Sequence, residues 1–326
     1  MKRRDFVRSA AIGAAAAGAA CSNTVASTPH EMTYTTLGKT NLRVSRLSYG
    51  SHLKEVNINN PAERDRQIQH AITKGVNLFD IYDHSYHQYE PMSKSLQGHN
   101  NVMISLYMTS TSVEEMVDEV LALFQRDAID LYRAMYEPEK LDGLIRMREK
   151  GKVKAVGVAH HIEEEFCKCA KEYGNDLDYL MFPYNFVHNK ATPKQEQNSY
   201  AAFLRLAKEY NYGLIGMKPF ANEMLLDFAR ENGYVGGPKD RGICLGSAAI
   251  RYALRGDVIH TSLPAMNSIR EIDENLAGVY NPELNSDEIE VLEEIDQLAM
   301  EHKWAYLNRK PHYRWLAQWA QRGGIA

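Results

Sequence analysis

Residues 75–86 read GVNLFDIYDHSY, and this stretch decides the fold. Its apolar run, Val76 to Phe79, is short enough for a buried strand and ends abruptly at Asp80, before a polar, aromatic-rich loop. A helical pattern precedes it, and a second strand-like run, 102–106, follows. Strands that alternate with helices form parallel sheets, whose reactive groups lie where strands end. The pattern places Asp80 at the mouth of a barrel, although on spacing alone a capping or loop aspartate explains it as well.

Composition bounds the class of protein. The chain has 326 residues, 44% hydrophobic and 25% charged, which is enough for one large α/β domain with a full core. A formal net charge of −4 and scattered charges give no reason to expect nucleic acid as a partner. The four cysteines do not form a disulfide framework. Cys167 and Cys169 point to different faces of a predicted helix, so they are weak support for a metal site.

Residues 1–21 have the features of an export signal. A basic start with a twin arginine, Arg3 and Arg4, is followed by Phe6 and by an Ala/Gly-rich run that ends at Cys21. The run is too short to span a membrane. It resembles a Tat signal, which exports proteins after they have folded. Cys21 is either a lipidated N-terminus, since the residues before it loosely resemble a lipobox, or lies near a plain cleavage site.

Three segments follow from this reading. We expect a signal peptide at 1–21, a linker at 22–33 and a barrel domain at 34–326 that ends in a covering segment. The aromatic and basic tail, 304–319, either folds over the barrel mouth as a lid or packs against the barrel wall or a partner chain. The protein is therefore expected in the periplasm or anchored on its membrane surface, with membrane contact only through a lipid at Cys21. Its oligomeric state is left open.

Eight apolar runs are predicted as barrel strands, after a hairpin at 34–44 that closes the barrel floor. The runs are 44–49, 76–79, 102–106, 128–134, 153–158, 179–183, 213–217 and 258–263. Amphipathic helices such as 113–124, 200–210 and 246–254 lie between them. The order favours a (β/α)8 barrel. A doubly wound sheet is the alternative, but no GxGxxG motif follows any strand.

Several sequence blocks resemble the aldo-keto reductase family, in the family's order. They are LGKTNLRVSRL from Leu37, GVNLFD from Gly75, IDLY from Ile129, GKVKAVGV from Gly151, GLIGMKP from Gly213, and LPAMN from Leu263 running on to Glu274 and Asn275. The blocks MFPYN, from Met181, and MKP are similar to a divergent bacterial branch, some of whose members carry Tat leaders. The resemblance covers about residues 34–300 and implies a (β/α)8 barrel with oxidoreductase activity.

The resemblance also implies a catalytic set, which this chain keeps only in part. The family reduces carbonyls with NADPH: a tyrosine donates the proton, a lysine lowers its pKa, an aspartate holds the lysine, and a histidine orients the carbonyl. Asp80 matches the aspartate. The tyrosine position is Ser85, with Tyr86 one residue late, the lysine position is Tyr107, and the histidine position is Met135. Asp80 is thus expected to lack its partner, and Tyr86 its activating cation.

The cofactor positions implied by the resemblance are mixed. Asn275 matches the asparagine that contacts adenine, but the arginine that clamps the 2′-phosphate falls on Glu271. A pyrophosphate needs a cation, which Lys218 can supply. If a nicotinamide cofactor, NAD(P), binds, the missing arginine favours NAD over NADP. The expected cofactor-binding residues are Lys218, Pro264, Asn267, Arg270, Glu274 and Asn275.

The groups beyond the strand ends suggest how the site is remodelled. Five histidines lie there, namely His52, His84, His87, His160 and His161. Imidazoles and carboxylates that converge bind a divalent metal or supply a different acid/base set. Our hypothesis is an oxidoreductase that acts on a small carbonyl or sugar-derived substrate, with Asp80, Tyr86, Tyr107 and His160 as proton-handling groups. The alternatives are a metal-assisted lyase or isomerase and a ligand-binding pseudoenzyme.

Overall fold

A computed structural model of the chain describes residues 31–51, 60–82, 86–186, 194–221 and 223–301. Eight parallel strands form one sheet in sequence order, from β3 to β10. They are β3 (Tyr49–Gly50), β4 (Leu78–Ile81), β5 (Met103–Tyr107), β6 (Ile129–Ala134), β7 (Val153–Ala159), β8 (Tyr179–Pro183), β9 (Gly213–Met217) and β10 (Thr261–Leu263). Parallel bridges from Leu47 to Ser262 and from Gly50 to Ala265 join the first strand to the last. The predicted (β/α)8 barrel is confirmed.

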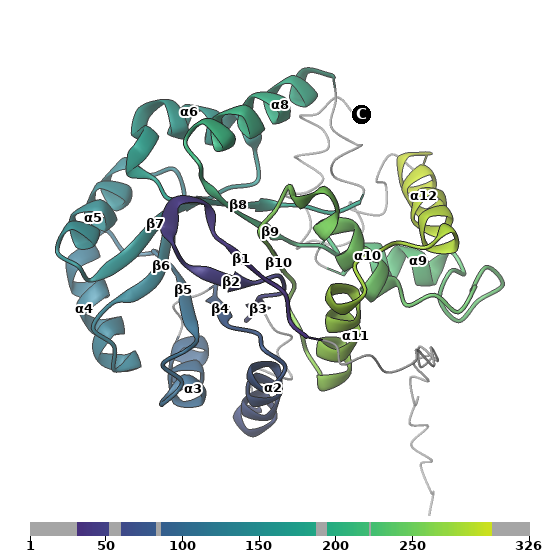
Figure 1. Ribbon diagram of the computed structural model, residues 1–326, viewed down its shortest axis with the longest axis horizontal. Coiled ribbons are helices and arrows are strands. Elements are labelled where there is room, and N and C mark those ends of the chain that lie inside the picture. Colours follow the sequence, from purple (N-terminus) through teal and green to yellow (C-terminus); the bar gives the residue numbers. More distant parts are fainter. Residues whose placement is uncertain (1–30, 52–59, 83–85, 187–193, 222, 302–326) are drawn as a thin grey trace, which may run out of the picture.

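Helices surround the strands on the outside (Figure 1). They are α2 (Pro61–Thr73), α3 (Tyr86–Leu96), α4 (Val113–Phe124), α5 (Pro138–Glu149), α6 (Glu163–Tyr173), α8 (Lys194–Glu209), α9 (Met224–Glu231), α10 (Leu245–Leu254), α11 (Ile269–Tyr280) and α12 (Ser286–Glu301). Within the described ranges, no helix combines the length and apolarity needed to cross a membrane. The proposed signal segment and the tail after α12 lie outside these ranges.

A hairpin covers one end of the barrel, as the purple ribbon in Figure 1 shows. Its strands, β1 (Tyr34–Thr36) and β2 (Arg43–Ser45), pair antiparallel. The prediction that a barrel strand starts at Val44 is therefore wrong. Val44 pairs with Thr35 of the hairpin, and the barrel strand itself begins only at Tyr49. One apolar run thus serves two strands with different partners, which hydrophobic pattern alone does not reveal.

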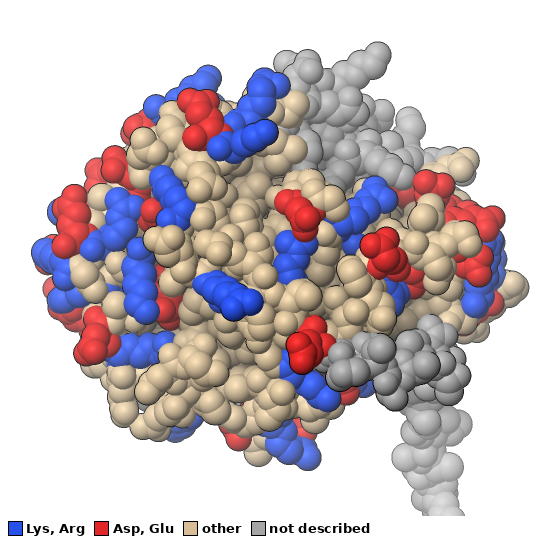
Figure 2. All heavy atoms as spheres, viewed as in Figure 1, with Lys and Arg blue, Asp and Glu red and all other residues tan. Residues whose placement is uncertain are grey.

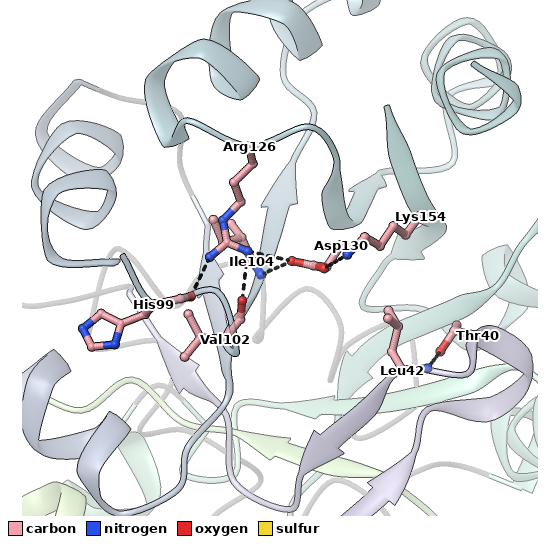
Figure 3. Close-up of polar contacts among 8 residues, drawn as sticks. All are labelled: Thr40, Leu42, His99, Val102, Ile104, Arg126, Asp130 and Lys154. Atoms are coloured by element: carbon pink, nitrogen blue, oxygen red, sulfur yellow. Dashed lines mark hydrogen bonds and ion pairs between the residues drawn. The ribbon is translucent and has the colours of Figure 1, made fainter. Parts of the chain in front are cut away.

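The floor at the hairpin end is held by the aspartate of the IDLY block (Figure 3). Asp130, near the start of β6, accepts hydrogen bonds from the Ile104 backbone N–H at 2.9 Å and from Lys154 at 2.7 Å. Arg126 binds the same carboxylate and the Val102 carbonyl. Because Asp130 lies at the opposite end of β6 from the barrel mouth, its role in this fold is to join strands.

Side chains inside the barrel come from alternate residues of each strand, because strand side chains point to opposite faces in turn. Most of this interior is apolar, with Leu78, Met103, Leu131, Ala155, Tyr179, Met181, Ile215 and Leu263 among its members. The residues two positions after the first three of these are Asp80, Ser105 and Arg133. The interior therefore changes from apolar to polar along β4, β5 and β6, in the direction of the strand ends.

The surface carries charges of both signs. On the face shown in Figure 2, lysine and arginine side chains are interspersed with aspartate and glutamate. Many of these charged side chains form ion pairs between neighbouring helices and strands. One example is Lys150 with Glu114, at 2.8 Å. No single-sign field is seen on this face, in keeping with the scattered charges of the sequence.

Candidate active site

A buried ion pair lies inside the barrel near the strand ends. Asp80 of β4 is 3% exposed, and Arg133 of β6 is 1% exposed. Arg133 donates to both carboxylate oxygens, from Nη2 to Oδ2 at 3.0 Å and from Nη1 to Oδ1. Ser105 of β5, which lies between them, donates to Asp80 Oδ1 at 2.7 Å and accepts from Arg133 Nη1 at 2.9 Å. Three adjacent strands thus contribute one polar cluster.

The expectation that Asp80 lacks a partner is wrong. Burial acts to lower the pKa of Arg133, but the attraction of Asp80 and further contacts outweigh it, so that this pKa lies above its ordinary value. Arg133 is therefore a permanent cation beside the carboxylate. An arginine with two hydrogen bonds to Asp80 thus stands in for the lysine of the family pattern, whose position in this chain is Tyr107, and it comes from the next strand along.

Tyr107 lies against this cluster. It is the register partner of Arg133, and the guanidinium carbon of Arg133 lies 5.6 Å from the centroid of its ring. Its other aromatic neighbour is Tyr82, whose ring is stacked on it at 5.9 Å and 10°. Burial raises the pKa of Tyr107, helped by Tyr82 and Glu137 and opposed by Arg133. The phenol therefore keeps its proton at neutral pH.

The other two proposed proton-handling residues are not brought to this cluster by any described contact. His160, after β7, packs edge-on against Phe166 of α6 at 6.1 Å. Its Nδ1 accepts a hydrogen bond from the Ile162 N–H at 3.1 Å, which leaves Nε2 as the donor of the neutral ring. Burial lowers the pKa of His160, which favours that neutral form. Tyr86 begins α3, and its side chain lies outside the described part of the structure.

Lys218 follows β9 with left-handed backbone geometry, at φ 58°. Its carbonyl accepts a hydrogen bond from the Asn185 side chain at 3.2 Å, which supports this geometry. Burial lowers the pKa of Lys218 to about 8. The ammonium is still mostly charged at pH 7, and an anion such as a pyrophosphate would favour its charged form further.

The turn before α11 is closed by its own side chains. Ser268 accepts from the Glu271 N–H at 3.1 Å, and the Glu271 carboxylate accepts from the Asn267 N–H at 2.7 Å. The Asn267 carbonyl accepts from Gln67 of α2 at 3.0 Å. Glu271, which stands where the family has a phosphate-binding arginine, thus places a negative charge at the start of the helix.

The remaining expected cofactor residues divide into two groups. Glu274 and the buried Asn275 lie beside Gly246, where an added Cβ would be 3.9 Å from Glu274 Oε2 and 3.7 Å from Asn275 Oδ1. Burial raises the pKa of Glu274. Arg270 is largely exposed and lies 3.8 Å from Glu274. Pro264, by contrast, helps to close the barrel, because its carbonyl accepts from the Gly50 N–H at 2.9 Å.

The metal alternative finds no support among the residues that the structure describes. Within them, no group of three or more His, Cys, Asp or Glu side chains is arranged to hold a metal ion. His52 and His84 lie outside the described residues, as does the side chain of His87. The histidine cluster as a whole is therefore not tested.

A model of the aldo/keto reductase family matches residues 47–297. The chain belongs to the aldo-keto reductase family. This confirms the resemblance seen in the sequence blocks, and membership in the family supports an oxidoreductase activity in general terms. No match to a curated protein was found by sequence.

Solved aldo-keto reductases share the fold. The apo form of the aldo-keto reductase AKR11C1 from Bacillus halodurans superposes with a TM-score of 0.62 at 20% identity, covering 81% of this chain and 96% of that one. Its holo form gives 0.61 at the same identity and coverage. A Pseudomonas aeruginosa protein described as a candidate aldo-keto reductase gives 0.60 at 16% identity, covering 80% and 99%. At these identities the likeness shows a shared barrel.

Two members of the cluster were missed by sequence reasoning. Arg133 and Ser105 were passed over as parts of buried strands, although a charged residue in the run IDLYRA carries a signal. A buried arginine needs a charged or hydrogen-bonding partner, and its position two residues after Leu131 places it on the interior face.

Proposed function

We propose that the protein is a nicotinamide-linked reductase that acts on a small carbonyl or sugar-derived substrate through a remodelled proton-donating site. The observation that carries the proposal is the buried Asp80–Arg133 pair against the ring of Tyr107. A carboxylate, a cation and a phenol thus lie in series near the strand ends. These are three of the four chemical groups of the family's mechanism, supplied here by β4, β6 and β5, whereas Met135 stands at the histidine position.

Tyr107 is the proton donor in this proposal. Its raised pKa keeps the phenol protonated, so that it can donate a hydrogen bond to the oxygen of a carbonyl substrate. Addition of hydride turns that oxygen into an alkoxide, which is a much stronger base than a phenolate. The proton then passes from Tyr107 to the alkoxide, and Arg133, against the ring, stabilises the phenolate that remains.

Asp80 takes no part in proton transfer in this scheme. It is fully engaged by Arg133 and Ser105, and its role is to hold the guanidinium in place. Arg133 therefore acts as the activating cation, and Asp80 and Ser105 act through it as positioning residues. The raised pKa keeps the Tyr107 phenol protonated at neutral pH, which is the form that the reduction step uses.

The residues near α10 and α11 fit the adenosine part of a nicotinamide cofactor. The buried Asn275 amide lies beside Gly246, whose missing side chain leaves room, and it would contact the adenine. Lys218 would hold the pyrophosphate by charge. A bound dihydronicotinamide would supply the hydride. A 2′-phosphate fits less well, since it would meet the Glu271 carboxylate, so the proposed cofactor is NAD(H).

We also propose export by the Tat route, either as a lipoprotein anchored at Cys21 or as a protein cleaved nearby. The support is the twin-arginine leader of the sequence. Export of a folded protein allows a tightly held cofactor to travel with it, which matters because the periplasm has no obvious pool of nicotinamide.

Native mass spectrometry tests the cofactor and the export proposal together. Protein recovered from the periplasm or its membrane is expected to have lost its leader and to carry NAD(H). The same spectrum shows whether Cys21 carries lipid. If the protein is recovered without cofactor, and neither NADH nor NADPH binds in a fluorescence titration, the proposed function is contradicted. A full-length mass with the leader intact contradicts export.

Removing the charge of Glu271 is expected to weaken the preference for NADH. Glu271→Gln keeps an oxygen that accepts from the Asn267 N–H, but it removes the repulsion of a 2′-phosphate. We expect NADPH affinity to rise about five- to tenfold and NADH affinity to change less than about twofold. The measurement is a binding titration of each nucleotide. The exposed Glu283→Gln variant is the matched control, and NADPH affinity that is equal in both variants would refute the assignment.

A further inference from the structure

We propose that Tyr82 is a substrate-binding residue that stacks on the apolar face of a neutral sugar ring. This deepens the function proposed above, on which it rests for the reaction, by naming the substrate class. Tyr82 directly follows β4 and is 48% exposed, whereas most large apolar side chains in the described part of the chain are buried. An exposed aromatic ring at a barrel mouth, next to the proposed proton donor, is well placed for a ligand.

The stack of Tyr82 on Tyr107 is preorganised for ligand binding. Tyr82 lies nearly parallel to Tyr107, with 10° between the planes and 5.9 Å between the centroids. Tyr107 is in turn backed by Arg133, which is locked by two hydrogen bonds to Asp80. The Tyr82–Tyr107 stack therefore rests on a buried, rigid support. Ligand binding should cost little conformational entropy, because these rings are already ordered.

The charge around the stack favours a neutral ligand. The charge of Arg133 is balanced by Asp80, and the pKa of Tyr107 keeps that phenol neutral. Glu137, an acidic residue that helps to raise the pKa of Tyr107, is paired with Lys140 at 2.7 Å. The cation–π position on Tyr107 is already occupied by Arg133, so a cationic ligand cannot take it. An anionic ligand cannot form a direct ion pair with Arg133, because that side chain is 1% exposed and donates to both carboxylate oxygens of Asp80.

A sugar ring matches these properties. Its C–H face is apolar and packs on an aromatic ring, while its edge carries hydroxyls that form hydrogen bonds with phenols such as Tyr107. A closed sugar ring is reducible only where it carries a further carbonyl, such as a ketone in the ring, so a keto-sugar would be the substrate of the proposed reduction. A flat aromatic ligand would also stack, and the experiment separates the two.

Saturation-transfer NMR without cofactor tests the proposal on the full chain. The probes are three neutral rings (methyl glucoside, methyl galactoside and methyl mannoside), acyclic sorbitol, charged glucuronate and aromatic benzyl alcohol. We expect saturation of the C–H face of at least one neutral ring, stronger than for the other probes. Tyr82→Ala should weaken its binding about tenfold, and Tyr82→Phe by less than about twofold. Ile289→Ala is the matched control, because Ile289 on α12 is also a large apolar residue that is exposed.

Several results would overturn the proposal: no saturation of any neutral ring, equal binding of sorbitol, preference for glucuronate or benzyl alcohol, or unchanged binding in Tyr82→Ala. Because Tyr82 is half exposed, its variants are expected to fold, and circular dichroism checks this. The binding measurement uses no nicotinamide. A failure of the cofactor proposal would therefore leave a Tyr82-dependent sugar signal in place, and the two outcomes can be told apart.

Discussion

Replacing Arg133 with methionine is expected to lower the free energy of unfolding by about 3–5 kcal/mol, because it leaves the Asp80 carboxylate buried without a counter-charge. The methionine fills much of the same volume, so the loss reports the charge rather than a cavity. Chemical denaturation followed by circular dichroism measures it, with the slope of the transition checked for a change in the unfolded state.

Two further variants make this result interpretable. Lys150→Met breaks an exposed ion pair with Glu114 and should cost about 0–1 kcal/mol. The double variant Asp80→Asn with Arg133→Met should recover part of the loss, since no buried charge is left unpaired. If Arg133→Met costs no more than Lys150→Met, the Asp80–Arg133 ion pair is not formed inside the barrel, and the proposed series of groups fails.

Replacing Tyr107 with phenylalanine is expected to lower kcat for carbonyl reduction by about 10²–10⁴-fold, because only the donated proton is lost. The ring that stacks on Tyr82 and packs against Arg133 remains. The measurement is steady-state oxidation of NADH with a carbonyl substrate. Tyr82→Phe is the matched control, since it also removes one phenol from the same stack, and it should keep kcat within about threefold.

The pH dependence of this reaction has a definite sign. The proton donor is active below its pKa, and the pKa of Tyr107 is raised. Activity due to this group should therefore persist through neutral pH and decline only as the pH rises through that raised pKa. If Tyr107→Phe keeps full kcat, the proton comes from another group, and Tyr107 is left as a packing residue.

Much of the barrel could be predicted from the sequence. The sixth and seventh strands, Tyr179–Pro183 and Gly213–Met217, and the helix Val113–Phe124 have the expected bounds. Strands buried on both faces appear as apolar runs, and the apolar positions of the outer helices recur every 3.6 residues. Both patterns can be recognised in a single sequence. The first barrel strand was misplaced because Val44 belongs to the hairpin.

The polar cluster was predicted only in part. Asp80 was placed near the strand ends from its position after an apolar run, and it does lie inside the barrel there. Its partner Arg133 could not be assigned, because the contact depends on the relative register of β4, β5 and β6, which the sequence does not state. The family pattern directed attention to position 107, one strand away from where the cation is found.

The role of Glu271 shows a second limit. The sequence spacing predicted only that Glu271 stands where the family has a phosphate-binding arginine. The structure adds that its carboxylate closes the turn before α11. Whether a glutamate at a helix start binds its own backbone or faces solvent is a matter of a few dihedral angles. Both the hydrogen bond from the Glu271 N–H to Ser268 and the direction of the Glu271 carboxylate were found only in the structure.

The cation on β6 has a consequence for substitutions at position 107. A lysine placed there would face a carboxylate whose oxygens are already taken by Arg133, so two positive charges would compete for one negative. Moving the cation from β6 to β5 therefore needs coordinated exchange on two neighbouring strands, because Tyr107→Lys alone would leave one of the two cations without a counter-charge.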